Sequence, residues 1–183
     1  MQLNLANKIT LFRILMSPLV IVLLYFEGPF FCFLAALVFV LAIFSDWLDG
    51  YIARNGNMVT SLGKFLDPLA DKVLICSSLI MLVGLDWIPA WITIVIVCRE
   101  LVVTGLRAIA MDEGIVLAAD NYGKLKTILQ ACAMIPLLIH YPVWGIDLQP
   151  YAMVLLYIAM FLAVWSGANY IYNFYKTSLT KSV

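Results

Sequence analysis

The sequence predicts an all-α, polytopic membrane protein: six transmembrane helices in one bundle, with a polar cavity facing the cytoplasm. Of the 183 residues, 64% are hydrophobic and 12% are charged, and the mean hydropathy is +1.02. Soluble domains carry about 25% charged residues, so this composition indicates a chain that resides in a membrane. The apolar residues form six segments, each near the ~20 residues that a helix needs to cross a bilayer.

We expect each apolar segment to form one transmembrane helix. The segments cover approximately residues 10–26, 30–53, 62–85, 87–111, 122–141 and 150–175. Short links separate them, and turn-forming residues mark three of these links, at Gly28-Pro29, Gly84 and Pro142. No repeat or long linker divides the sequence, so residues 1–183 are expected to form a single domain.

The charges are distributed unevenly between the two ends of the predicted helices. All eleven basic residues fall toward one side: Lys8, Arg13, Arg54, Lys64, Lys72, Arg99, Arg107, Lys124, Lys126, Lys176 and Lys181. The links on the other side carry Glu27, Asp86, His140 and Asp147. Because cytoplasmic loops are enriched in Lys and Arg, we predict that the basic side and both termini are cytoplasmic. Lys8 and Arg13 then anchor the first helix at that face.

Four aspartates lie within strongly apolar sequence, where each ionised carboxylate costs about 2.5–3.5 kcal/mol to insert. Asp46 and Asp49 are three residues apart, so they share one face of a helix. Gly63, Asp67 and Asp71 follow at intervals of four and form a second stripe. If the two stripes face each other, the carboxylate oxygens converge. Such a cluster suits divalent cations that prefer oxygen, namely Mg²⁺, Mn²⁺ or Ca²⁺.

The residues around the aspartates point to phosphate chemistry. Four carboxylates balance two divalent cations, and two cations roughly 3.5–4 Å apart commonly serve displacement at phosphorus. Gly50, Ala53 and Gly63 have almost no side chain and would let a bulky ligand approach the backbone. Arg54 offers a fork of donors that suits phosphate. The alternative, that the aspartates are helix caps or surface charges in a loop, does not explain two pairs beside small residues.

A second group of charges comprises Arg99, Arg107, Lys124 and Lys126. Arg99 lies about a dozen residues into the fourth segment, ~18 Å along a helix. An arginine at such depth usually faces the bundle interior or a watery cavity. Arg107 lies two turns further on the same face, whereas Glu100 points from another face, so we expect no simple pair between Glu100 and Arg99. The group predicts a cationic pocket beside the metal site. The alternative is that these charges set the topology and contact lipid phosphates.

The stretch before the first segment carries Asn7 and Thr10 one helical turn apart, with Arg13 one turn further. From the residues alone, Asn7 is a plausible N-cap, and the rest of the stretch anchors the chain at the cytoplasmic face.

The aspartate motif resembles the signature of a known family. From Asp46 to Asp71 the chain reads Asp-x2-Asp-Gly-x2-Ala-Arg-x8-Gly-x3-Asp-x3-Asp, which is similar at every position to the signature of the CDP-alcohol phosphotransferases. The resemblance covers nearly the whole chain. It implies a metal-dependent enzyme of phospholipid biosynthesis in the bacterial cytoplasmic membrane. That enzyme would transfer the phosphatidyl group of CDP-diacylglycerol to the 1-hydroxyl of sn-glycerol 3-phosphate, giving phosphatidylglycerophosphate and CMP.

The resemblance also implies roles for the residues. Two divalent cations, Mg²⁺ or Mn²⁺, would be held by Asp46, Asp49, Asp67 and Asp71. The base for the acceptor hydroxyl would be Asp71. The nucleotide and its pyrophosphate would be bound by Gly50, Ala53, Arg54 and Gly63, with Asn7 and Thr10 nearby. The acceptor phosphate would be held by Arg99, Arg107, Lys124 and Lys126. Family members are typically homodimers surrounded by membrane lipids, and we expect no nucleic-acid partner.

Two other functions fit parts of the pattern. Within the same family, the acceptor alcohol could instead be inositol phosphate, phosphatidylglycerol, serine or an aminoalcohol. An acceptor without phosphate would not need the basic group around Arg99, so the sequence favours a phosphorylated one. A cation transporter also carries intramembrane carboxylates, but it has no need of Arg54 or of the small residues beside the acids.

Overall fold

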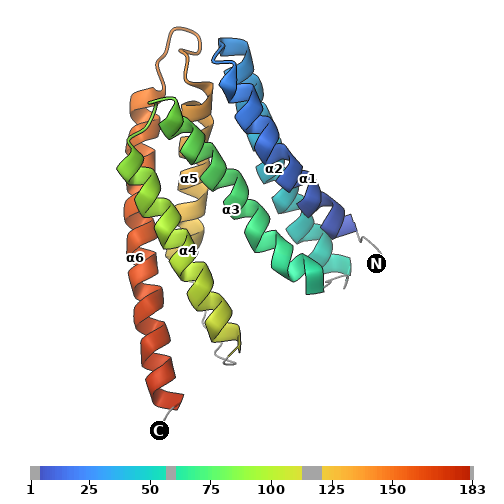
Figure 1. Ribbon diagram of the computed structural model, residues 1–183, viewed down its shortest axis with the longest axis vertical. Coiled ribbons are helices and arrows are strands. Elements are labelled where there is room, and N and C mark those ends of the chain that lie inside the picture. The colour runs from blue at the N-terminus through green and yellow to red at the C-terminus, as the bar shows by residue number, and fades with distance from the viewer. Residues whose placement is uncertain (1–4, 57–60, 113–120, 182–183) are drawn as a thin grey trace. The chain divides into compact units, whose positions relative to one another are not determined.

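The computed structural model describes residues 5–56, 61–112 and 121–181. Within these ranges the chain forms six α-helices and no β-strand (Figure 1). The helices are α1 (Leu5–Tyr25), α2 (Pro29–Gly56), α3 (Ser61–Gly84), α4 (Ala90–Asp112), α5 (Asn121–Ile139) and α6 (Gln149–Lys181). Each helix overlaps one of the predicted segments, so the prediction of an all-α chain with six helices is confirmed.

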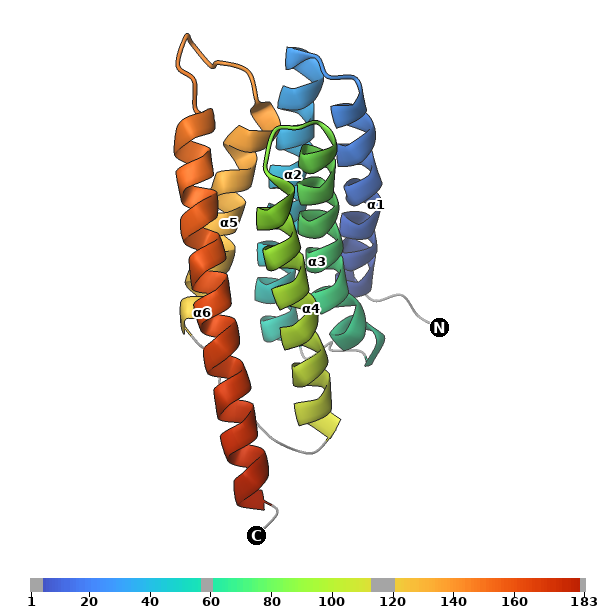
Figure 2. The ribbon, with the colours of Figure 1, turned by 60° about the vertical axis from the view of Figure 1, so that its left-hand side comes forward.

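The helices belong to two compact units. The first unit comprises Met1–Ile88 and Ile135–Gln149, and therefore contains α1, α2, α3 and the last turn of α5. The second unit comprises Pro89–Met134 and Pro150–Val183, and contains α4, most of α5 and α6 (Figure 2).

In the first unit, α1 packs against both α2 and α3. The buried side chains mix large and small apolar residues: Val20, Leu24, Ala35, Ala36, Phe39, Ala42, Ala70, Leu74, Leu79 and Leu82. Small residues such as Ala35 and Ala36 let apolar helices approach each other closely. One charged side chain joins this core, because Arg13 is only 1% exposed. The side chain of Arg13 therefore lies among the helices, and its anchoring of α1 at the cytoplasmic face stays a prediction.

Aromatic and polar contacts connect the links of the first unit. The rings of Trp87 and His140 stack with centroids 3.7 Å apart and planes 10° from parallel. The Tyr141 hydroxyl donates a hydrogen bond to the carbonyl of Glu27, at 2.6 Å. Glu27, Asp86 and His140 follow the ends of α1, α3 and α5 and have positive φ values of 45°, 59° and 58°. A residue in this conformation just past the last turn commonly ends a helix.

In the second unit, α6 presents a stripe of mainly small residues to its neighbours. Ala152, Leu156, Ala159, Ala163 and Ser166 are buried at alternating intervals of four and three residues. This spacing keeps one side of a helix facing its partners. Buried residues of α4 and α5 complete the core of the unit: Ile92, Ile96, Val103, Ala133 and Met134.

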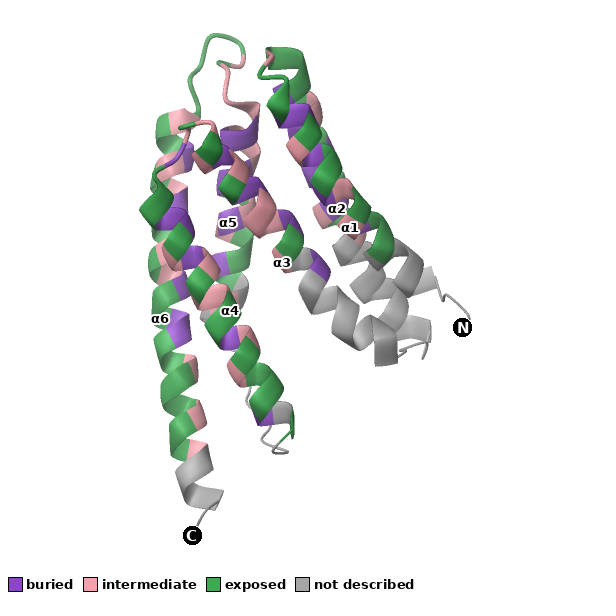
Figure 3. Cartoon of the chain, in the orientation of Figure 1, coloured by how far each residue is buried: buried purple, intermediate pink, exposed green. Residues whose placement is uncertain are grey.

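Many large apolar side chains are exposed along the helices (Figure 3). Examples on four different helices are Leu15, Phe33, Ile94 and Phe161. Among the described residues, Gln149–Thr177 (29 residues, mean hydropathy 1.9) is the one segment that is long and apolar enough to cross a membrane by length and composition. Shorter apolar segments of helix are Leu11–Tyr25, Pro29–Ser45, Lys72–Gly84 and Leu125–Ile139.

The Trp87–His140 stack predicts how stability depends on pH. Burial lowers the pKa of His140 below its ordinary value of 6.5, and the nearby Asp147 carboxylate offsets this only in part. The unfolded chain therefore binds a proton at His140 more readily than the folded chain does. Stability should consequently fall as the pH drops through the region below about 6.5.

We expect the thermal unfolding temperature of the detergent-solubilised protein to fall less on acidification in His140→Phe than in the wild type, since phenylalanine keeps a ring against Trp87 without ionising. Unfolding curves at about pH 7.5 and about pH 5.5 measure the difference. Equal losses in the two proteins would contradict the assignment.

Candidate active site

The two halves of the aspartate motif lie on helices of the first unit. Asp46 and Asp49 belong to the last three turns of α2, and Asp67 and Asp71 belong to the first three turns of α3. Both helices are continuous through the motif, so the intervals of three and four residues are helical intervals. The structure describes these residues only as parts of helices. The side chains of the motif residues from Asp46 to Asp71, and those of Asn7 and Thr10 in α1, lie outside the described part of the chain. Among the side chains that are described, no group of three or more His, Cys, Asp or Glu could hold a metal ion.

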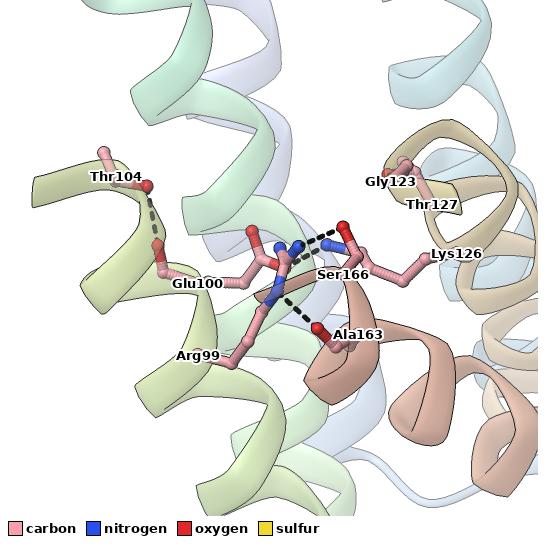
Figure 4. Close-up of polar contacts among 8 residues, drawn as sticks. All are labelled: Arg99, Glu100, Thr104, Gly123, Lys126, Thr127, Ala163 and Ser166. Carbon is pink, nitrogen blue, oxygen red and sulfur yellow. Dashed lines mark hydrogen bonds and ion pairs between the residues drawn. The ribbon is translucent and has the colours of Figure 1, made fainter. Parts of the chain in front are cut away.

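The second unit brings together much of the predicted cationic group (Figure 4). Arg99 of α4 reaches α6, where its Nε donates to the carbonyl of Ala163 at 2.8 Å and its Nη2 donates to the hydroxyl of Ser166 at 3.1 Å. Its Nη1 donates to Oε1 of Glu100 at 3.0 Å, and this contact is an ion pair as well as a hydrogen bond. Three of the five guanidinium N–H groups are thereby used. The remaining two, one on each terminal nitrogen, have no partner among the described residues.

The expectation that Glu100 and Arg99 would not pair is wrong. Adjacent residues of a helix do point about 100° apart, but both side chains are long enough to bend round the helix and meet. Lys126 of α5 pairs with the same Oε1 atom of Glu100. One carboxylate thus joins two cations that are separated by 27 residues of sequence. Because the Arg99, Glu100 and Lys126 side chains are only 13%, 14% and 6% exposed, this mutual pairing offsets much of the cost of burying their charges.

Gly167 makes the close approach of Arg99 to α6 feasible. A Cβ atom added at Gly167 would lie 3.1 Å from Cγ and 3.3 Å from Nε of Arg99, which is tighter than ordinary contact. Any side chain at position 167 would therefore press on Arg99 beside the Nε–Ala163 hydrogen bond. By contrast, a Cβ added at Gly105 of α4 would meet nothing within 4 Å.

Arg107 also faces α6. Its guanidinium carbon lies 5.8 Å from the centre of the Tyr170 ring, within range of a cation–π interaction. Arg99 and Arg107 therefore point to the same neighbouring helix, as their spacing of eight residues predicts. Four residues were predicted to bind the acceptor phosphate. Of these, Arg99 and Lys126 contact the same carboxylate, and Arg107 of α4 contacts α6. The side chain of Lys124 falls outside the described residues.

Reasoning from the sequence missed Glu100, Ser166 and Gly167. A signal was present, because Ala159, Ala163, Ser166 and Gly167 place small residues along one face of the sixth helix. Such a stripe indicates that another helix, or a long side chain from one, approaches closely. The sequence does not tell which side chain it receives.

A profile of the CDP-alcohol phosphatidyltransferase family matches residues 3–165. The chain belongs to this family. The match covers α1 to α5 and the first half of α6, so both the motif aspartates and the Arg99–Glu100–Lys126 group lie within the shared region, whereas Ser166 and Gly167 follow directly after it. The predicted resemblance is confirmed.

Named members of the CDP-alcohol phosphatidyltransferase family are similar to this chain over most of its length. The CDP-diacylglycerol–glycerol-3-phosphate 3-phosphatidyltransferase of Bacillus subtilis (strain 168) is 44% identical over 179 residues, covering 91% of this chain and 93% of that protein. The enzyme of the same name in Rickettsia typhi is 39% identical, covering 91% and 94%. A probable phosphatidylglycerophosphate synthase of Mycobacterium tuberculosis (H37Rv) is 39% identical, covering 92% and 80%.

Proposed function

We propose that this chain transfers the phosphatidyl group of CDP-diacylglycerol to the 1-hydroxyl of sn-glycerol 3-phosphate, giving phosphatidylglycerophosphate and CMP. The observation that carries the proposal is the set of relatives named for this reaction, which are 39–44% identical across 91% of the chain. The complete motif from Asp46 to Asp71 and the basic group of the second unit agree with it, since the substrates bear a pyrophosphate and a phosphate.

The motif aspartates fit two divalent cations, Mg²⁺ or Mn²⁺. Hard carboxylate oxygens suit these ions, and the helical backbone of α2 and α3, within one unit, supports the two stripes that the spacing predicts. Bound there, the cations would supply positive charge that offsets the charge developing on the phosphate oxygens. We assign as ligands Asp46, Asp49, Asp67 and Asp71.

The remaining roles belong to the protein's own side chains. Arg54 binds the pyrophosphate, and the cytidine end lies against the small residues Gly50, Ala53 and Gly63, with Asn7 and Thr10 of α1 nearby. The 1-hydroxyl oxygen of the acceptor forms a bond to the phosphorus that carries diacylglycerol. The bond from that phosphorus to the bridging oxygen breaks, and CMP leaves with this oxygen. Asp71 orients the hydroxyl and accepts its proton.

The acceptor phosphate is assigned to the basic group formed by Arg99, Arg107, Lys124 and Lys126. The two N–H groups of Arg99 that have no described partner lie on different nitrogens, a fork that matches two phosphate oxygens. Arg107 rests on the Tyr170 ring, which leaves its N–H donors for a further contact.

We place the six helices across the bacterial cytoplasmic membrane as one multi-pass domain over residues 1–183. Both termini and a polar cavity would face the cytoplasm, where the nucleotide and the water-soluble acceptor are found, and the acyl chains would remain in the bilayer. The support is the basic bias of one side, the apolar segment Gln149–Thr177 and the exposed apolar side chains. We also propose a homodimer, by analogy with the family.

The deciding test is CMP release by the purified protein in detergent, supplied with CDP-diacylglycerol and Mg²⁺, with and without glycerol 3-phosphate. We expect release that depends on glycerol 3-phosphate and is lost on adding EDTA. Release with a different alcohol alone would keep the reaction but change the acceptor. No release with any alcohol would overturn the proposal and make cation flux the next measurement.

Replacing one motif aspartate tests the proposed metal ligands. Asp67→Asn or Asp71→Asn should abolish CMP release while the protein still inserts and purifies, because each change removes a negative charge and an oxygen ligand. Asp86→Asn is the matched control, since Asp86 is exposed in the link after α3 and should leave turnover unchanged. Wild-type turnover in either motif variant would contradict the two-cation site.

Kinetics of the basic residues test the acceptor assignment. Arg99→Ala or Arg107→Ala should raise the KM for glycerol 3-phosphate by at least about tenfold, since a lost hydrogen bond to a charged group costs about 1.5–3 kcal/mol. The KM for CDP-diacylglycerol should change little, and Lys176→Ala, near the exposed end of α6, should resemble the wild type. If the two KM values rose equally, the acceptor phosphate would have to be assigned elsewhere.

A further inference from the structure

Four residues that do not themselves offer a cation to the substrate surround Arg99 or Lys126, namely Glu100, Ala163, Ser166 and Gly167. Ser166 and the Ala163 carbonyl fix two nitrogens of Arg99, and Glu100 fixes the third. Gly167 leaves the space in which the Arg99 side chain lies against α6. The same Glu100 oxygen contacts Lys126, so α4, α5 and α6 meet at one guanidinium and one carboxylate (Figure 4).

We propose that Glu100, Ser166 and Gly167 are positioning residues for the acceptor site: they hold Arg99 and Lys126 as a preformed pair for the phosphate of the acceptor. This inference rests on the proposed function. It adds residues that bind no substrate and act through the orientation of the two cations.

The physical basis is preorganisation. A free arginine side chain samples many rotamers, and binding a phosphate with it would require ordering four torsions at that moment. Here the ordering is achieved in the folded protein, since three different acceptors restrain the guanidinium plane. The two N–H groups without described partners are then held in fixed directions. A small displacement of such a group from its working geometry loses much of the binding or rate that the group provides.

Glu100 has a separate part in this arrangement. Without it, the like charges of Arg99 and Lys126 would repel each other across a site with little access to water. With it, both cations are held close together by one carboxylate oxygen. Glu100 therefore holds the two cations at a spacing at which one anion could contact both.

Gly167→Ala provides the sharpest test, because the three atoms nearest to the added methyl group all belong to Arg99. We expect the KM for glycerol 3-phosphate to rise about tenfold, while kcat and the KM for CDP-diacylglycerol stay within about twofold. Gly105→Ala is the matched control on α4, where a methyl group meets open space, and it should behave as the wild type. Thermal unfolding of each purified variant monitors folding.

A double-mutant cycle separates positioning from a general packing defect. In an Arg99→Ala background the three Arg99 atoms nearest to the methyl group of Gly167→Ala are gone, so its effect on the KM should vanish. A packing defect would instead add to the effect of Arg99→Ala. Additive effects, or a wild-type KM in Gly167→Ala, would overturn the role of Gly167.

Two further pairs of variants test the other positioning residues. Glu100→Gln should raise the KM for glycerol 3-phosphate. Glu100→Asp, which keeps the charge, should raise this KM less than Glu100→Gln does. Ser166→Ala should show the same selective rise, and Ser166→Thr, which keeps the hydroxyl, should not.

If the wild type released no CMP with glycerol 3-phosphate, the proposed function would fall and this inference with it. Normal wild-type turnover with unchanged KM values in all variants would overturn the inference alone.

Discussion

The structure depends on how charged groups are accommodated within apolar helices. In the second unit Arg99, Glu100 and Lys126 are each mostly buried, and the Glu100 carboxylate of α4 pairs with both Arg99 of α4 and Lys126 of α5. In the first unit, Arg13 is 1% exposed in the middle of α1, and the four motif aspartates lie on α2 and α3. A buried charge is tolerated where it is paired, hydrogen-bonded or bound to an ion of opposite charge. Each unit thus combines charges of both signs, and such costly groups are kept in apolar surroundings chiefly where they serve function.

Small residues make these charge contacts feasible. A helix formed only of large apolar residues would keep its neighbours too far away for Arg99 to reach the backbone carbonyl of Ala163. Along α6, the stripe from Ala152 to Gly167 removes that barrier, and the guanidinium can use a carbonyl that already accepts a bond within its own helix. The carbonyl has a second lone pair for this purpose. Gly167 is therefore required by the close approach of a side chain and not by the backbone conformation of the helix.

The sequence was sufficient to predict the six helices, because each apolar segment is long enough to form one and is bounded by turn-forming or polar residues. Their ends were less predictable: α1 begins at Leu5 and α6 extends to Lys181, beyond the apolar segments, since polar residues continue a helix once it has begun. Spacing along one helix was also informative, as Arg99 and Arg107 both face α6. The contacts of Arg99 with Ala163 and Ser166 join residues 64 and 67 positions apart. Such contacts depend on how helices pack, which a single sequence does not reveal, and the burial of Arg13 was missed for the same reason.

The charge balance of the second unit bears on which alcohol is the acceptor. In the group of Arg99, Glu100, Arg107 and Lys126, three positive side chains accompany one carboxylate. Arg107 contacts an aromatic ring and keeps its whole charge. Counted over these four side chains alone, the charges sum to +2. A phosphate monoester carries about −1.5 to −2 charges at neutral pH and would balance that excess.

A neutral or zwitterionic acceptor such as serine would leave the positive charge of the group uncompensated, at a cost that grows as water is excluded. The same balance disfavours phosphatidylglycerol, whose phosphodiester has a single negative charge, and so favours an acceptor of the glycerol 3-phosphate type.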